Sequence, residues 1–158
     1  MARELLVVWS GRHQRDEWEV LCSRYRSRIE RWQPVRDLPV RSTREGPDAV
    51  RIEAEGRSLL AALPDPCWPI ALDRRGRPSG SRALATRLTK LNEEWPHPVA
   101  FLIGSDLGLS REVLETSRER LSLGPLTLPH ELARLVLYEQ LYRALSIRAG
   151  IKYHREPL

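Results

Sequence analysis

The basic end of the sequence gathers side chains that recognise nucleic acids. Two cations, an aromatic ring and an imidazole occupy four consecutive positions, Lys152, Tyr153, His154 and Arg155. An aromatic face can stack on an unpaired base, and Lys or Arg side chains bind phosphate groups. The same composition is also typical of a frayed basic terminus. The segment alone therefore leaves both interpretations open.

Three further segments combine small residues with the ends of apolar runs. They are Leu72-Asp73 with the Gly/Pro/Arg stretch that follows, the stretch from Gly104 to Gly108, and the stretch from Leu123 to Leu128. Exposed backbone donors and acceptors in such segments can bind a flat heteroaromatic ring. Paired glycines after a strand are also common in ordinary turns. The glycine fingerprint of dinucleotide-binding proteins and the P-loop pattern are both missing from the sequence.

A long segment with helical periodicity precedes the basic end. His130 lies at its start, where it is a candidate for proton transfer as well as an ordinary polar residue of a first helical turn. Glu139 and Arg143 are four residues apart, a spacing that predicts an exposed ion pair on one helix face.

The elements that position these residues follow from hydrophobic periodicity. Apolar runs predict buried strands at 5–9, 68–72 and 99–103, an edge strand at 35–40 and a short strand at 121–123. Helices are predicted to begin after Asp16 and Pro47 and to cover 83–91, 111–120 and 130–147. Asp16 and Glu19 form a potential capping box for the first helix. Residues 74–81 are predicted to form a loop.

The order of these elements predicts the fold class. Strands alternate with helices throughout, and the third to fifth strands are expected to be apolar on both faces. This pattern favours an α/β domain with a mostly parallel sheet flanked by helices, spanning residues 1–158 as one unit. In open parallel sheets, ligands bind beyond the carboxyl ends of the strands, and the three small-residue segments fall there.

Composition narrows the partners and the location. The net charge of +5 and the isoelectric point near 9.8 favour an anionic partner such as nucleic acid. No apolar run approaches the roughly 20 residues that span a bilayer, and the short apolar start looks like a strand rather than a signal peptide, so we expect a cytoplasmic protein without a membrane partner. Cys22 and Cys67 lack nearby ligands, so we expect core residues and no metal site.

The separate motifs together resemble one known family, the RlmH family of ribosomal RNA pseudouridine N3-methyltransferases. The resemblance is strongest in the last third, in Leu126–His130, Arg134, Glu139–Ala144, Ile147 and Tyr153–Arg155. It extends to Leu72-Asp73 with Gly76, to residues 101–104 with Gly108-Leu109, and to the spacing of Tyr25 and Glu55-Gly56. One loop departs from the pattern. The family usually reads Gly-Gly-Pro-acidic-Gly where this chain reads Gly104-Ser105-Asp106-Leu107-Gly108.

The resemblance implies a fold, a cofactor and a reaction. The fold is the SPOUT-type α/β knot with a C-terminal trefoil knot, in a homodimer whose cofactor sites lie near the two-fold interface. The cofactor is S-adenosyl-L-methionine, and the reaction is N3-methylation of a pseudouridine in the helix-69 stem-loop of 23S ribosomal RNA. By the family pattern, the cofactor pocket is lined by Leu72, Gly104, Leu123, Gly124, Pro125, Leu126, Thr127 and Leu128.

The resemblance also suggests roles for the basic end and the last helix. The predicted catalytic set is His154, Tyr153, Arg155, His130 and Arg143. Tyr153 is expected to stack near the target base, while Arg143, Lys152 and Arg155 contact phosphates. His154, His130 and Asp106 are equal candidates for accepting the N3 proton.

Two other functions remain open at this point. A related knotted methyltransferase would act on another RNA, such as transfer RNA. A non-catalytic ribosome-binding module would have lost its cofactor, an interpretation that the altered stretch from Gly104 to Gly108 motivates.

Overall fold

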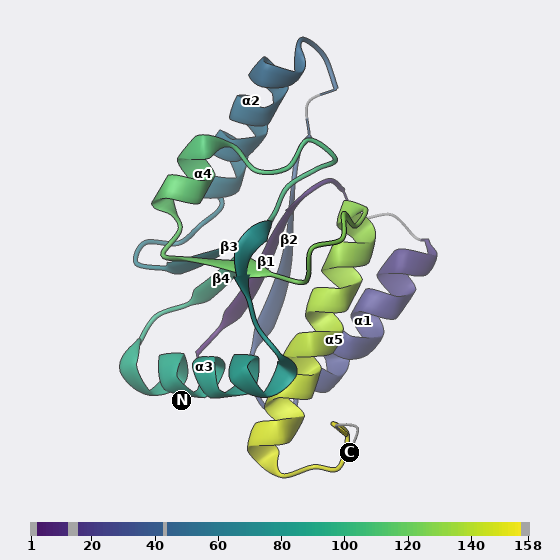
Figure 1. Ribbon diagram of the computed structural model, residues 1–158, viewed down its shortest axis with the longest axis vertical. Coiled ribbons are helices and arrows are strands. Elements are labelled where there is room, and N and C mark those ends of the chain that lie inside the picture. The colour runs from purple at the N-terminus through teal and green to yellow at the C-terminus, as the bar shows by residue number, and fades with distance from the viewer. Residues whose placement is uncertain (1–2, 13–15, 43, 156–158) are drawn as a thin grey trace.

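The computed structural model describes residues 3–12, 16–42 and 44–155 and has one sheet with helices on both faces (Figure 1). Within these ranges five strands, all paired in parallel, lie in the order β2-β1-β4-β3-β5. The strands are β1 (Leu5–Ser10), β2 (Val35–Val40), β3 (Trp68–Pro78), β4 (Val99–Ile103) and β5 (Glu119–Ser122). The helices are α1 (Glu17–Ile29), α2 (Asp48–Ala61), α3 (Ser81–Glu94), α4 (Arg111–Thr116) and α5 (His130–Ala149). The predicted parallel α/β sheet is confirmed.

The two central strands divide the hydrophobic core into two layers. Leu5 and Val7 of β1 belong to a cluster with residues of α1, α3 and α5. Leu6 of β1 belongs to a second cluster with Leu59 of α2 and Val113 of α4. Because successive side chains of a strand point to opposite faces, both faces of β1 and β4 are buried. Their unbroken apolar runs follow from this burial.

The last part of β3 and the start of β5 differ from the prediction. β3 continues to Pro78, so the loop expected at 74–81 is wrong over most of its length. Arg77 and Pro78 pair with Leu121 and Ser122 after a register shift that follows Leu72. These pairs join residues more than forty positions apart, and local periodicity carries no information on such contacts.

The pairing of β5 also ends α4 early. The helix expected to reach Arg120 stops at Thr116, and Ser117 takes an extended conformation with φ −68° and ψ 138°. β5 lies at the edge of the sheet, and Arg120 on it is exposed. The expectation of two apolar faces is therefore wrong for β5, and correct for β4.

The start of α1 follows the prediction in part. The Asp16 carboxylate caps the helix by accepting a hydrogen bond from the Glu19 backbone N–H at 3.0 Å. The Glu19 carboxylate accepts instead from Arg26 at 2.7 Å and from Arg134 of α5 at 2.6 Å. The capping residue is thus confirmed, while the second acid serves to join α1 to α5.

A buried ion network fixes α5 against the sheet. Arg134 and Asp37 are each 3% exposed and lie 2.9 Å apart, and Asp37 also accepts hydrogen bonds from Tyr138 and from the Trp9 indole. Burial raises the pKa of Asp37, but the hydrogen bonds from Arg134 and Tyr138 outweigh it and hold that pKa below its usual range. The network positions the first turns of α5, where His130 lies.

α5 is the longest helix, with 20 residues. It packs against α1 and α3 and ends at Gly150, whose φ of +73° gives a left-handed cap. In the described ranges, no helix combines the length and the apolar character needed to cross a membrane.

Candidate active site

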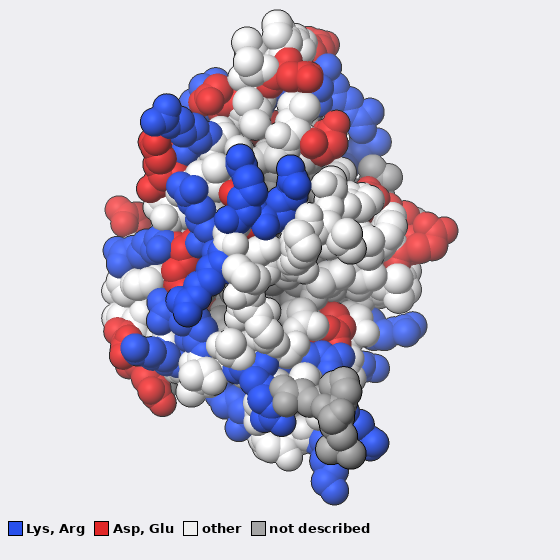
Figure 2. All heavy atoms as spheres, in the orientation of Figure 1, with Lys and Arg blue, Asp and Glu red and all other residues white. Residues whose placement is uncertain are grey.

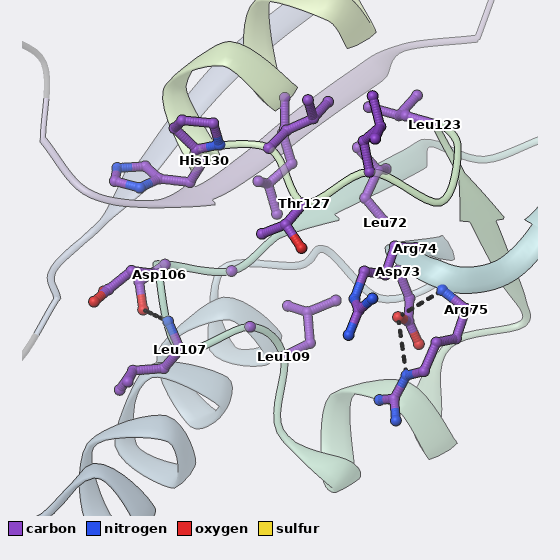
Figure 3. Close-up of a pocket in the computed structure, with 18 of the residues that line it drawn as sticks. Leu72, Asp73, Arg74, Arg75, Asp106, Leu107, Leu109, Leu123, Thr127 and His130 are labelled. Atoms are coloured by element: carbon purple, nitrogen blue, oxygen red, sulfur yellow. Dashed lines mark hydrogen bonds and ion pairs between the residues drawn. The ribbon is translucent and has the colours of Figure 1, made fainter.

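A cavity of about 800 Å³ opens beyond the carboxyl ends of β4 and β5, beside the register shift that follows Leu72 in β3 (Figure 3). The middle of β3, the loops after β4 and β5 and the start of α5 form its walls, and we call it the loop cavity. Its lining comprises Leu72–Arg75, Ile103–Leu109, Leu114, Leu121, Leu123, Gly124, Leu126–His130 and Ala133. The three segments that the sequence singled out are therefore brought together at one edge of the sheet.

Most of the residues predicted to bind a cofactor line the loop cavity. They are Leu72, Gly104, Leu123, Gly124, Leu126, Thr127 and Leu128. Pro125 is exposed and does not belong to the lining. In Figure 3, Thr127 points into the hollow between the loops that follow β3 and β4.

The loop after β4 folds back on itself so closely that only glycine fits at its start. A Cβ atom on Gly104 would lie 2.3 Å from the carbonyl oxygen of Gly108. Gly108 has a φ of +80°, which favours glycine, and its N–H donates to the Ser105 carbonyl at 3.0 Å. The glycines thus allow a tight turn whose backbone faces the cavity.

A buried acid holds this turn, and the sequence prediction missed its role. Glu55 of α2 is 1% exposed, and its carboxylate accepts from the hydroxyls of Ser105 at 2.6 Å and Ser42 at 2.7 Å. The Leu107 N–H lies 3.3 Å from the Ser105 hydroxyl. Ser105 occupies the position of the second glycine in the family pattern, so its side chain adds an anchor there. The sequence does contain a signal for this buried acid. Glu55 lies one helical turn before the apolar Leu59, so both residues fall on the buried face of α2.

The loop after β5 is anchored by Ser122. The hydroxyl of this buried residue lies 3.0 Å from the Arg74 carbonyl and accepts from the Gly124 N–H at 3.1 Å. Gly124 has a φ of +123°. These contacts tie the stretch from Leu123 to Leu128 to the end of β3.

The two ends of the loop cavity carry different chemistry. In Figure 3, His130 and Asp106 lie on one side, and Arg74 and Arg75 lie on the other. Asp73 accepts from the Arg75 N–H at 3.1 Å, and its carboxylate lies 3.6 Å from the Arg75 guanidinium. Groups that accept protons therefore lie opposite groups that bind anions.

Four residues at the far end of α5 form what we call the tail cluster. Glu139 pairs with Arg143, Tyr153 donates to Glu139 at 3.1 Å, and Nη1 of Arg143 lies 3.2 Å from Nδ1 of His154. The side chains of Glu139 and Arg143 are 19% and 24% exposed, so the expectation of an exposed ion pair is wrong. The tail folds back and covers that pair, which the helical spacing alone does not show.

The contacts of the tail cluster define which of its groups donate and which accept. Burial and the nearby Glu139 carboxylate raise the pKa of Tyr153, so its hydroxyl remains a donor. A guanidinium can only donate, so Nδ1 of His154 accepts and the ring carries its proton on Nε2. Arg155 and Lys152 are exposed beside this cluster.

The loop cavity and the tail cluster lie at opposite ends of α5. His130 begins the helix and Arg143 is thirteen residues later, a rise of about 20 Å. The five predicted catalytic residues are therefore not brought together within one chain. His130 lines the loop cavity, and the other four lie near the end of the helix.

The two cysteines are free thiols, one buried and one partly buried. Cys22 is buried in the core and Cys67 packs on it in part, and burial raises the pKa of each thiol to about 11. Both thiols therefore stay protonated. Within the described residues, no group of three His, Cys, Asp or Glu side chains is placed to hold a metal ion.

A parallel sheet with a cavity beyond its carboxyl ends is the arrangement of α/β proteins that bind nucleotide-like ligands. Residues 3–154 match the family model described as "Predicted SPOUT methyltransferase". The chain therefore belongs to the SPOUT methyltransferase family.

Relatives from two bacteria agree with this assignment. The "Ribosomal RNA large subunit methyltransferase H" of Solidesulfovibrio magneticus is 38% identical over 152 residues, which cover 96% of this chain and 99% of the relative. The protein of the same name from Xylella fastidiosa (strain M23) is 40% identical over 156 residues, which cover 95% and 97%. The similarity thus spans nearly the whole of each protein.

Solved structures share the fold at low sequence identity. A probable methyltransferase from Bordetella pertussis Tohama I superposes with a TM-score of 0.54 at 18% identity, covering 91% of this chain and 96% of its own. A putative methylase family protein from Neisseria gonorrhoeae gives 0.54 at 14% identity, covering 99% and 88%.

Proposed function

We propose that this chain transfers a methyl group from S-adenosyl-L-methionine to N3 of a pseudouridine in the helix-69 stem-loop of 23S ribosomal RNA. One observation carries the proposal. The segments that resemble the signature loops of ribosomal RNA methyltransferases converge on a single cavity, in a chain whose full-length relatives are named ribosomal RNA methyltransferases. The substrate implies that the protein works in the cytoplasm, where ribosomes are.

The loop cavity fits such a cofactor in size and lining. Its volume of about 800 Å³ accommodates a ligand of this class. The backbone around Gly104 and Gly124 presents polar groups that can bind an adenine ring, while Leu72 and Leu109 offer apolar contact. Ser105 does not close the cavity, because its side chain turns towards Glu55.

The chemistry requires positioning and one proton transfer. When bound, S-adenosyl-L-methionine supplies a methyl group on a sulfonium, which is activated for in-line attack by the N3 lone pair of the base. His130 and Asp106 lie together at one end of the loop cavity. We assign the acceptance of the N3 proton to this pair, directly or through water.

The tail cluster binds the RNA in this proposal. Tyr153 stacks near the target base, and Arg143, Lys152 and Arg155 contact phosphates. His154 acts as a hydrogen-bond donor through Nε2, because the Arg143 guanidinium engages Nδ1. This state argues against His154 as the proton acceptor.

A homodimer is required to complete the site. Because α5 holds the loop cavity and the tail cluster about 20 Å apart, one chain cannot offer both to the same base. A two-fold axis that pairs α5 with its copy in opposite directions would place one protomer's tail beside its partner's loop cavity. Each active site would then combine residues of both protomers.

Removing the tail separates cofactor binding from catalysis. A chain truncated after Lys152 keeps every residue of the loop cavity. We expect it to bind S-adenosyl-L-methionine in calorimetry as the full chain does, and to transfer no methyl group to ribosomal RNA. Full activity of the truncated chain would remove the tail from the mechanism, and absence of cofactor binding by the full chain would favour a non-catalytic module.

A further inference from the structure

A band of basic side chains beside the loop cavity has no part in the chemistry above. Residues 73–90 contain six basic residues and one acidic residue, which accounts for the whole net charge of +5 of the chain. The remainder of the chain is electrically balanced. In Figure 2, Lys and Arg side chains gather in a band across the front of the molecule, where Figure 1 places β3. The band consists of Arg74, Arg75, Arg77, Arg82, Arg87, Lys90 and Arg120.

The band connects two hollows of the surface. Arg74 and Arg75 line the loop cavity. Arg77, Arg87 and Arg120 line a second cavity of about 760 Å³ between α3 and the β3–β5 edge. Leu121 of β5 borders both cavities. The basic side chains therefore follow a continuous hollowed surface that begins at the proposed cofactor site.

Carboxylates neutralise only part of the charge of this surface. Asp73 pairs with Arg75 at 3.6 Å, and Glu94 pairs with Lys90 at 3.9 Å. Glu119 is engaged by Arg87 through two hydrogen bonds, at 2.7 and 2.9 Å, and by the Trp68 indole at 2.6 Å. In the described part of the chain, no carboxylate lies within ion-pair distance of Arg120 or Arg74, and both side chains are exposed. Concentrated like charge of this kind lowers stability through self-repulsion, so a counterion of opposite charge would be favourable here.

We infer that this basic band binds the phosphodiester backbone of the RNA next to the target nucleotide. The inference rests on the proposed function. Planar guanidinium groups bind phosphates through two parallel hydrogen bonds, and such contacts position a nucleic acid without reading its sequence. With the target base at the loop cavity, the adjoining strand passes over β3 and α3. The band therefore sets the path of the RNA across β3 and α3.

The test compares two variants with the same change in charge. Arg77→Glu with Arg120→Glu alters the band without touching the loop cavity. Arg44→Glu with Arg57→Glu is the matched control, because both residues are exposed and lie outside the band. Binding of a hairpin transcript of large-subunit ribosomal RNA is measured from about 50 to 200 mM salt, and cofactor binding is measured by calorimetry.

We expect the band variant to bind the hairpin about tenfold more weakly at low salt and to lower the salt slope by about 1 for each lost phosphate contact. Its affinity for S-adenosyl-L-methionine and its melting temperature should stay unchanged. The control should bind as the wild type does. If charge reversal disturbs folding, Arg77→Gln with Arg120→Gln serves instead, and it should also weaken binding of the hairpin, by a smaller factor.

Three results would overturn the inference. They are unchanged RNA binding by the band variant, equal losses in both variants, and displacement of the wild-type complex by polyglutamate as readily as by RNA. The proposed function fails separately. A wild type that binds RNA through the band and methylates no ribosomal RNA would contradict only the function, whereas normal methylation and RNA binding by the band variant would contradict only the inference.

Discussion

Single residues determine the shape of the loop after β4, which lines the loop cavity. Gly104 and Gly108 approach each other so closely that the turn has no room for a side chain at its start. Ser105 between them is held by a buried carboxylate from α2. Where the family has a flexible glycine, this chain therefore has a serine whose side chain is hydrogen-bonded to Glu55.

Replacing Gly104 with alanine should weaken cofactor binding. The new Cβ would lie 2.3 Å from the Gly108 carbonyl oxygen, so the turn must open. Gly80→Ala is the matched control, because Gly80 has a φ of −71° and nothing within 4 Å of a Cβ atom. In calorimetry with S-adenosyl-L-methionine, strain of about 1–3 kcal/mol corresponds to a loss of affinity of about 5- to 150-fold for Gly104→Ala. Equal affinities of the two variants would contradict this account.

Ser105→Ala should weaken the cofactor site as well as the fold. It leaves the buried Glu55 carboxylate with one hydroxyl partner fewer, which costs about 1–3 kcal/mol. Ser42→Ala removes the other hydroxyl of the same carboxylate but lies outside the loop cavity. Both variants should melt at a lower temperature, and only Ser105→Ala should bind S-adenosyl-L-methionine more weakly. A parallel loss of affinity in Ser42→Ala would refute a specific role of the anchor.

Among the elements, α5 carries both groups of candidate residues and depends on a buried charge for its position. Arg134 and Asp37 are almost fully buried, and each would be left without a counter-charge if its partner were removed. Breaking such a pair costs about 3–5 kcal/mol. The ion network thus links the sheet edge to the helix that bears His130.

Asp37→Asn should destabilise the protein and reduce its sensitivity to acid. At neutral pH the loss of the charge should lower the melting temperature by about 10 °C. Because the pKa of Asp37 is held below its usual range, the carboxylate stabilises the fold above its pKa in the unfolded chain, and this contribution is lost as the pH falls through the lowered value. Thermal unfolding measured from pH 7 down to about 3 should therefore show a shallower acid dependence in the variant. An unchanged acid dependence in the variant would show that Asp37 does not cause the loss of stability at low pH.

Local pattern accounts for some elements and not for others. β1 and β4 are buried on both faces, so their unbroken apolar runs sufficed to predict them. The end of β3 carries the exposed Arg77 and becomes a strand only through its pairing with Leu121 and Ser122 of β5. The start of β5 carries the exposed Arg120 and becomes a strand only through its pairing with Ile70 and Ala71 of β3. Such pairing depends on the tertiary fold, which periodicity does not encode.

In the candidate site, too, local pattern predicts some features, and others depend on tertiary contacts. The cavity residues could be predicted because small residues follow strand ends, and parallel strands bring those ends to one edge. The contact between Glu55 and Ser105 joins positions 50 apart, and that between Arg134 and Asp37 joins positions 97 apart. Neither pair has a local signature. The predicted helix over 130–147 already separates His130 from Arg143, whereas the contact of Tyr153 with Glu139 has no local signature.

For the whole molecule, the decisive question is whether one chain or two make an active site. The trefoil knot and the homodimer stay predictions of the family resemblance. The 20-residue length of α5 gives the dimer a physical reason, because it keeps the tail away from the loop cavity of its own chain.

Two inactive variants should therefore restore activity when combined. With the cofactor kept below the Kd of Gly104→Ala, this variant keeps the tail and has an empty loop cavity, while a chain truncated after Lys152 keeps the cavity and loses the tail. Half of the dimers formed by co-expression are mixed, and each holds one complete site, so about a quarter of the wild-type activity should return. Native mass spectrometry checks that mixed dimers form. Mixed dimers without activity would show that the tail acts within its own chain.

The most direct test of the central claim is to map methyl groups on RNA after reaction in vitro. The purified protein is incubated with isotopically labelled S-adenosyl-L-methionine and with ribosomes and transfer RNA from cells that lack the gene, and the RNA is digested and analysed by mass spectrometry. The account predicts one labelled methyl group, on N3 of a pseudouridine in the helix-69 stem-loop of 23S ribosomal RNA. A label on transfer RNA, or none on either RNA, would contradict it.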